Sequence, residues 1–325
     1  MTTAQPQRIK TPRRALHGVL LLDKPLGLSS NDALQKAKRL LRAEKAGHTG
    51  TLDPLATGLL PLCFGAGTKF SQISLDADKA YEAVLHLGLT TTTGDAEGDV
   101  LEHCAVNVTA EQIAAACAQL TGAIDQVPPM YSALKHEGRP LYEYARAGIV
   151  IERPSRRVTI HAIDILDWQA DQLTLAVRCS KGTYIRTLAE DIGRLLGCGA
   201  SLAALRRTGS GTLRVDQAIS LDALAALTEI EREALLRPPD SLLADWPELR
   251  LSSAEAARFL TGLRRRLDPG SAADVPHVRV YGPEPNAFLG SAHITAGELI
   301  ADRLLSPQEV QSLTGSESKF LESQV

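Results

Sequence analysis

The chain has 325 residues, of which 44% are hydrophobic and 22% are charged, and its formal net charge is −3. This composition is typical of a globular protein and excludes an intrinsically disordered chain, while the length allows one large domain or two unequal domains. Proteins that bind nucleic acid through charge alone are strongly basic, and this chain is not. If it binds nucleic acid, local basic patches must make the contacts.

Neither a membrane segment nor an export signal is expected. The longest apolar runs, at 18–22 and 58–64, fall well short of the ~20 residues that a membrane-spanning helix requires. Residues 1–17 are basic and polar and lack the apolar stretch of a secretory signal, so we expect a cytoplasmic protein. The five cysteines are scattered, without a C-x-x-C pair, which predicts reduced packing residues rather than disulfides or a zinc cluster.

The first part of the chain predicts alternating strands and helices. A buried strand is expected over 18–22, followed by a helix that Ser30 or Asn31 caps and that runs to about Arg42. The stretch 47–67, rich in Gly, Thr and Pro, is expected to be mainly loop around a strand at 59–64. A half-buried strand over 81–87 comes next, and then a helix that Thr109 caps and Gly122 ends.

The second part predicts an inserted subregion, a hairpin, a helix and a second domain. Pro128 and Pro129 break the pattern, and a short helix between Pro140 and Gly148 belongs to the insertion. Strands at 158–166 and 173–179 form the hairpin, and the helix over 185–196 has its apolar positions on one face. Pro-rich breaks place a boundary near Ala244, which gives a basic tail (1–17), a main domain (18–244), a small second domain (245–313) and a polar tail (314–325).

Positive charge is concentrated in four stretches of the sequence. Each is compatible with contacts to RNA phosphates and equally with an ordinary solvated surface. The stretches run from Arg8 to Arg14, from Lys36 to Lys45, from Arg153 to Arg157 and from Arg206 to Arg214.

The most informative segment is 47–60, GHTGTLDPLATGLL. Its glycines permit backbone turns that other residues cannot make, and Pro54 biases Asp53 away from helical geometry towards an extended one. The Asp53 carboxylate is thereby held at a fixed angle. On these physical grounds alone, an Asp in such a loop is more often a turn former than a catalyst.

Two further stretches, 18–30 and 179–188, are equally specific in composition. In these three stretches the sequence resembles the bacterial tRNA pseudouridine-55 synthases of the TruB family, and the resemblance continues through Tyr81 and 127–135 to about Gly209. It implies an α+β pseudouridine-synthase fold, in which a mixed, mainly antiparallel sheet is flanked by helices and carries an inserted RNA-gripping subdomain. It also implies a small C-terminal PUA-like β domain, where the match from Leu249 onward rests on position.

The resemblance assigns roles to individual residues. Asp53, in the G-x-L-D-P-x-A-x-G pattern, would be the nucleophile, and Arg186 would lie beside it and favour its ionised form. Tyr81 would stack on the flipped base and could move a proton. The resemblance also implies substrate contacts from His48, Tyr184 and Leu205. Lys24 would steady the first motif, residues 18–30.

Pseudouridine formation breaks the N-glycosidic bond, rotates the uracil in place and joins ribose C1′ to C5, without net redox change or hydrolysis. The resemblance therefore implies neither a cofactor nor a metal. A carboxylate could attack C1′ or, alternatively, C6 of the base, and the sequence does not separate these routes.

Other interpretations remain open beside this one. The same pocket could belong to a non-catalytic module that binds or folds tRNA, but the intact Asp53 motif favours catalysis. An RNA-guided synthase within a protein complex is a further alternative, yet the bacterial-type sequence favours a monomer that acts on the T-arm of tRNA without guide RNA or protein partner. A hydrolase is disfavoured because no second carboxylate, metal cluster or Ser–His pair lies at suggestive spacing.

Overall fold

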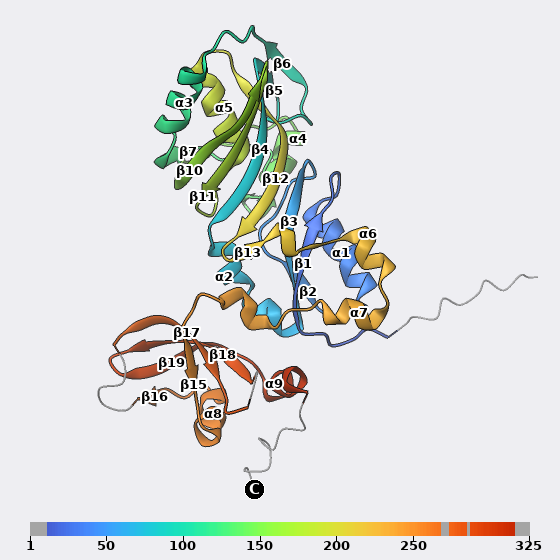
Figure 1. Cartoon of the computed structure of the whole chain (residues 1–325), viewed down its shortest axis with the longest axis vertical. Helices are drawn as coiled ribbons and strands as arrows, with labels where there is room; N and C mark the ends of the chain where they lie inside the picture. Colours follow the sequence, from blue (N-terminus) through green and yellow to red (C-terminus); the bar gives the residue numbers. More distant parts are fainter. Residues whose placement is uncertain (1–11, 268–272, 285–286, 316–325) are drawn as a thin grey trace, which may run out of the picture.

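The computed structural model describes residues 12–267, 273–284 and 287–315 (Figure 1). Arg8, Lys10 and the polar tail beyond residue 315 therefore lie outside the described residues. Two sheets of ten and five strands organise the chain, and helices flank them, so the predicted α+β class is confirmed. None of the described helices is both long and apolar enough to cross a membrane.

The larger sheet has the strand order β14-β1-β3-β12-β4-β11-β10-β7, with β2 added to β3 and β13 to β12. Its pairs are antiparallel except for β1 with β14 and β3 with β12, which agrees with the predicted mixed, mainly antiparallel sheet. The strands are β1 (Gly18–Lys24), β2 (Ala46–His48), β3 (Ala56–Phe64), β4 (Lys79–Leu87), β7 (Gly122–Gln126), β10 (Arg156–Gln169), β11 (Gln172–Cys179), β12 (Ala200–Ser210), β13 (Leu213–Arg214) and β14 (Ile219–Ser220).

Helices cover this sheet in two groups, visible at opposite ends of the larger part in Figure 1. One group, α3 and α5, packs on β4, β10, β11 and β12, and the other, α1 and α6, packs on β1 and β3. The helices of the main domain are α1 (Ser30–Leu40), α2 (Ser71–Asp76), α3 (Ala110–Gln119), α4 (Leu141–Arg146), α5 (Ile185–Leu196), α6 (Leu221–Ala226) and α7 (Glu229–Ala234), with short 3₁₀ turns η1 (Gly65–Lys69), η2 (Val215–Gln217) and η3 (Pro239–Leu243).

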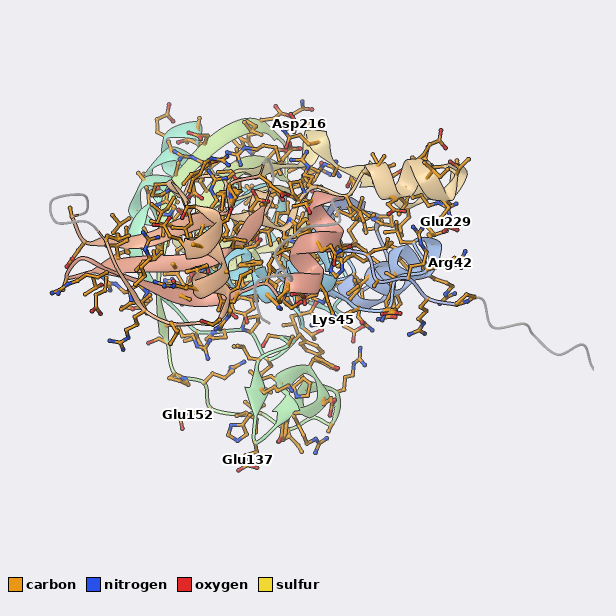
Figure 2. All side chains as sticks on the ribbon, turned by 90° about the horizontal axis from the view of Figure 1, so that it is seen from below. Arg42, Lys45, Glu137, Glu152, Asp216 and Glu229 are labelled. Carbon is orange, nitrogen blue, oxygen red and sulfur yellow. The ribbon has the colours of Figure 1, made fainter. Side chains whose placement is uncertain are left out.

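The inserted subregion begins after β7 and contains the small hairpin of β8 (Lys135–His136) and β9 (Arg139–Pro140), followed by α4. Figure 2 shows it projecting from the body, with Glu137 at its far end. A second small hairpin pairs β5 (Leu89–Thr91) with β6 (Val100–His103), and the turn between them contributes residues to the candidate site.

Three predicted boundaries were wrong. The N-cap of α1 is Ser29, whose side chain accepts the Asp32 N–H, whereas the Ser30 side chain turns inward to another segment. Gly122 does not end α3, which stops at Gln119; Gly122 starts β7 instead, opposite Ile160. The loop expected over 47–67 is confined to 49–55, because pairing with β12 extends β3 back to Ala56.

The smaller sheet has the order β15-β17-β18-β19-β16 and forms the C-terminal β domain. Its elements are β15 (Glu248–Arg250), α8 (Ser253–Leu260), β16 (Arg265–Arg266), β17 (Val275–Tyr281), β18 (Phe288–Thr295), β19 (Glu298–Leu304) and α9 (Pro307–Thr314). The first of these strands begins shortly after the boundary that we propose from the sequence near Ala244.

The C-terminal β domain does not have a hydrophobic core of its own, because its cluster includes residues of the main domain. In β1, Leu20 and Leu22 face α1, while the alternate residues Val19 and Leu21 join one hydrophobic cluster with the second sheet. Phe70 and Phe288 meet in this cluster at a ring separation of 5.2 Å, both almost fully buried. The two sheets therefore share a core, and β1 and β3 contribute one face to each of two clusters.

Because Phe70 is buried where the two parts meet, we expect Phe70→Ala to lower the free energy of unfolding by about 3–5 kcal/mol. The measurement is urea denaturation followed by circular dichroism. Leu263→Ala, at a side chain that is 66% exposed, is the control and should change stability by less than about 0.5 kcal/mol. If Phe70→Ala lowers the free energy of unfolding no more than the control does, the shared core does not hold the main domain and the C-terminal β domain together.

Candidate active site

The loop 49–55 between β2 and β3 carries Asp53 and is fixed to its neighbours through main-chain atoms. The Leu52 N–H donates to Ser30 Oγ over 2.8 Å, and Ser30 Oγ donates to the Leu52 carbonyl over 3.1 Å. The Gly27 N–H donates to the Pro54 carbonyl over 2.9 Å. The inward turn of Ser30 thus clamps the residue next to Asp53, whose own side chain remains 43% exposed.

Lys24 joins the first motif to this loop. Its side chain is fully buried, and Nζ donates to the carbonyls of Leu28 at 2.5 Å, Pro25 at 3.0 Å and Pro54 at 3.5 Å. Burial lowers the pKa of the Lys24 ammonium to about 8, against the attraction of Asp53. The structure therefore places Lys24 behind the loop, holding main-chain carbonyls.

Arg186 approaches Asp53 from the first turn of α5. Arg186 is 5% exposed, and its Nη2 lies 3.0 Å from Asp53 Oδ2 while its Nη1 lies 3.4 Å from Asp95 Oδ2. The same two nitrogens donate to the Tyr131 carbonyl at 2.6 Å and to the Thr93 carbonyl at 3.1 Å. One buried cation thus joins the Asp53 loop, the turn between β5 and β6, and the inserted subregion.

The charge on Asp53 reflects opposing influences. Burial raises the pKa of its carboxyl above the ordinary value, the cation of Arg186 lowers it, and the nearby carboxylate of Asp95 raises it further. Arg186 therefore moderates the rise in pKa without reversing it. Glu97, in the same turn as Asp95, also has a raised pKa, because it is partly desolvated and faces both Asp95 and Asp53.

A cavity of about 570 Å³ opens above this ion pair. Of the residues singled out in the sequence, His48, Asp53 and Arg186 line it, whereas Lys24, Tyr81, Tyr184 and Leu205 do not. The inserted subregion closes one side, and the lining includes Ser30, Thr51, Asp95, Glu97, Tyr131, Ser132, Tyr142 and Arg146.

Tyr81 and Leu205 lie on neighbouring central strands. Leu205 of β12 is opposite Ala83, and both Tyr81 and Leu205 are partly buried against the cluster that holds α5. Burial raises the pKa of the Tyr81 hydroxyl, and the charge of Asp53 adds to the rise. Tyr81 is thus within electrostatic range of Asp53, although it does not line the cavity.

Tyr184 is positioned by Gln126, the last residue of β7. The amide of Gln126, 2% exposed, accepts the Tyr184 N–H at 3.0 Å and donates to the Tyr184 carbonyl at 3.3 Å. Because Tyr184 is the N-cap residue of α5, this clamp also fixes the start of the helix that carries Arg186.

His48 ends β2 at the rim of the cavity. Its Nδ1 is buried and finds no hydrogen-bond partner among the described residues. Burial, aided by the charge of Arg207, lowers the pKa of the imidazole, which favours the neutral ring. His48 therefore contributes a neutral imidazole to the wall of the cavity.

Sequence reasoning missed Asp95, Glu97 and Gln126. The segment 93–99, TGDAEGD, has the composition of a solvated acidic turn. Its alternation of glycine and acidic residues is the only local feature that could have pointed to Asp95 and Glu97 as site residues. Within the described ranges, no group of three or more His, Cys, Asp or Glu side chains is arranged to hold a metal ion.

Several cations of the predicted basic stretches are already engaged. Arg42 pairs with Glu229 at 2.9 Å, and Arg206 pairs with Asp23 at 2.7 Å. Arg207 is buried, so its assignment to a surface patch was wrong. Lys36 and Arg39 are exposed on α1 and form no ion pair within the described part of the chain, which leaves them accessible to phosphate.

Solved structures share this fold. A chain from an H/ACA RNP bound to a substrate RNA containing 2′-deoxyuridine matches with a TM-score of 0.68 at 23% identity, covering 90% of this chain and 86% of that one. Family models place the chain among the pseudouridylate synthases. The model for the TruB family pseudouridylate synthase N-terminal domain matches 38–185, that for the tRNA pseudouridylate synthase B C-terminal domain matches 186–244, and that for the TruB C-terminal region of pseudouridine synthase II matches 247–305.

Curated relatives agree over nearly the whole length. The tRNA pseudouridine synthase B of Cupriavidus pinatubonensis is 60% identical over 308 residues, covering 93% of this chain and 97% of the relative. The protein of the same name from Verminephrobacter eiseniae is 58% identical over 317 residues, covering 95% of each. The chain therefore belongs to the TruB family, as the sequence motifs predict.

The raised pKa of Asp53 gives a pH prediction. Asp95→Asn keeps the side-chain shape but removes a negative charge, so the Asp53 carboxyl should lose its proton at lower pH. If ionised Asp53 drives the reaction, the acid limb of the single-turnover rate of pseudouridine formation should move to lower pH. Asp99→Asn, at an exposed residue of the same turn, is the control and should leave the limb in place. An Asp95→Asn limb that stays or moves to higher pH would contradict the electrostatic assignment.

Proposed function

We propose that the chain isomerises one uridine in the T-arm of tRNA to pseudouridine, with Asp53 as the nucleophile. Membership of a pseudouridylate synthase family makes the chain an isomerase, and its relatives are named tRNA pseudouridine synthase B. The observation that carries the residue assignment is the pair of Asp53 and Arg186, 3.0 Å apart, at the floor of an open cavity.

The chemistry needs a carboxylate that is fixed in direction yet reachable. Asp53 meets both conditions, since main-chain bonds hold its loop while its side chain is 43% exposed. Attack by a carboxylate oxygen on C1′ would break the N-glycosidic bond, whereas attack on C6 would first form an adduct with the base. On the first route the detached uracil turns and its C5 bonds to C1′, which releases the Asp53 carboxylate. On the second route the N1–C1′ bond breaks in the adduct, the base turns, C5 bonds to C1′, and Asp53 then leaves C6. In either route the proton on C5 leaves and N1 takes up a proton, so that the product is an isomer of the substrate.

The remaining residues have supporting tasks in this proposal. Because a base within a folded RNA must leave its stack to react, an aromatic ring and an apolar side chain are needed to receive it, and we assign these to Tyr81 and Leu205. Neither lines the cavity in this structure, so the assignment requires the cavity to widen towards the central strands when RNA binds. The hydroxyl of Tyr81 is our candidate for proton movement at C5, and its proximity to the charge of Asp53 supports this assignment. His48 and Tyr184 would contact the RNA, and Lys24 would hold the loop.

We further propose that the protein acts in the cytoplasm, where tRNA is found, as a monomer without guide RNA or protein partner. In support of the tRNA substrate, relatives that match over nearly their whole length are named tRNA pseudouridine synthase B. The exposed cations Lys36 and Arg39 on α1 are suited to the phosphates of the RNA. A non-catalytic module that only binds tRNA is the alternative, and the intact pair of Asp53 and Arg186 argues against it.

Asp53→Asn should retain tRNA affinity and lose conversion, because the amide is isosteric but cannot act as the nucleophile. The measurements are filter binding and pseudouridine detection in unmodified tRNA, with purified protein alone. Asp99→Asn is the matched control and should behave as the wild type. Wild-type protein that binds tRNA but forms no pseudouridine would favour the non-catalytic alternative, and a fully active Asp53→Asn variant would remove Asp53 from the chemistry.

A further inference from the structure

Arg207 is the largest side chain in the described interior that is almost fully buried, at 1% exposure. It lies in β12, in the middle of the larger sheet, opposite Tyr81 of β4 on one side and Gly58 of β3 on the other. Cross-strand partners share a face of the sheet, so Arg207 and Tyr81 project to the same side.

Its hydrogen bonds lead to the Asp53 loop. Nε donates to the Leu59 carbonyl over 2.7 Å, and Nη2 donates to the Gly50 carbonyl over 3.0 Å. Gly50 opens the segment that contains Asp53, so the guanidinium connects the sheet directly to that loop. No ion pair formed by the residues in the described ranges includes Arg207, and both of these acceptors are neutral.

The two glycines of the Asp53 motif lie against Arg207, Gly50 at its side chain and Gly58 at its main chain. Gly50 has a φ of +75°, and a Cβ there would lie 3.1 Å from Arg207 Nη1. Gly58 has a φ of +97°, and a Cβ there would lie 2.3 Å from the Arg207 carbonyl oxygen. Both positions combine a left-handed backbone with a close approach, which only glycine tolerates. Gly50 therefore leaves room for the Arg207 guanidinium, and Gly58 allows the main chains of β3 and β12 to lie close together.

A purely structural explanation is poor, because a buried charge without an ionic partner is costly and an apolar side chain would suit such a site better. Lys79 provides the comparison. It is also buried, but its Nζ donates to the Ser74 and Ala77 carbonyls at the end of α2, where a cation favours the helix terminus. Lys79 thus has a structural task, whereas the bonds of Arg207 lead to the site.

The charge of Arg207 also acts on groups of the site. It lowers the pKa of the Tyr81 hydroxyl, against the larger opposing effect of burial. It also reinforces burial in lowering the pKa of His48. These effects follow the geometry, since the guanidinium lies between the strand of Tyr81 and the loop that follows His48.

We propose that Arg207 is a positioning residue, which fixes the Asp53 loop and Tyr81 relative to each other through its bonds to Gly50 and Leu59 and its place opposite Tyr81. This inference rests on the proposed function and adds a residue to it. Arg207 does not line the cavity and is almost fully buried, so its loss should leave tRNA affinity intact and slow the chemical step.

The test is Arg207→Lys, which keeps the charge but loses the planar fork that serves two carbonyls at once. We expect the dissociation constant for tRNA to stay within about twofold, and the single-turnover rate at saturating protein to fall by about 10²-fold, the usual effect of a misplacement of roughly 1 Å. Arg206→Lys is the matched control at the adjacent, half-exposed residue and should keep the wild-type rate. An Arg207→Lys rate within about threefold of wild type, or a loss that merely follows the unfolded fraction, would overturn the proposal.

Tyr81→Phe, combined with Arg207→Lys, provides a readout that a stability defect would not move. If Arg207 acts partly through Tyr81, the rate of the double variant should exceed the product expected from the two single losses. Fully multiplicative losses would overturn that part of the inference. A wild-type protein that forms no pseudouridine would instead refute the proposed function, which distinguishes the two failures.

Should Arg207→Lys fail to fold, Arg207→Met tests the same contact without changing the Asp53 loop. Methionine suits a buried site but cannot donate to the Gly50 and Leu59 carbonyls. The proposal then requires a slow chemical step with tRNA binding retained, and a wild-type rate would overturn it.

Discussion

The site depends on the burial of one guanidinium at the start of α5. Arg186 contacts Asp53, Asp95 and the carbonyls of Thr93 and Tyr131, which belong to three segments that are distant in sequence. The apolar face of α5, including Leu188 and Ile192, packs on the central strands and thereby fixes the depth at which the guanidinium lies. Removing one partner from such a buried pair typically costs about 3–5 kcal/mol, so the segments around Arg186 are held as a unit.

The buried cations Lys24 and Arg207 fix the position of the Asp53 loop rather than neutralise its charge. Lys24 and Arg207 donate mainly to main-chain carbonyls on either side of the Asp53 loop, and their hydrogen bonds determine where the loop lies. Asp53 consequently remains partly exposed to the cavity, with a pKa that burial raises and Arg186 restrains. The Asp53 carboxylate is therefore fixed in direction, and its partial removal from water keeps it reactive as a nucleophile.

Local patterns in the sequence predict local structure well. The buried strand at 18–24, the hairpin of β10 and β11 and the one-sided helix α5 were found because each has its own hydrophobic period. Contacts between distant segments leave no such local pattern. Asp95 resembles a turn residue until folding brings it to Arg186, and Arg207 resembles part of a surface patch until β3 and β4 enclose it. The motif resemblance, and not periodicity, pointed to Asp53.

The most direct test of the role of Arg186 is the single-turnover conversion of tRNA by Arg186→Lys, with tRNA affinity measured in parallel. Lysine keeps the positive charge but cannot serve Asp53, Asp95 and two carbonyls together. We expect an affinity within about threefold of wild type and a conversion rate lower by at least about 10²-fold. A variant that converts tRNA at the wild-type rate would contradict the claim that this guanidinium organises the site.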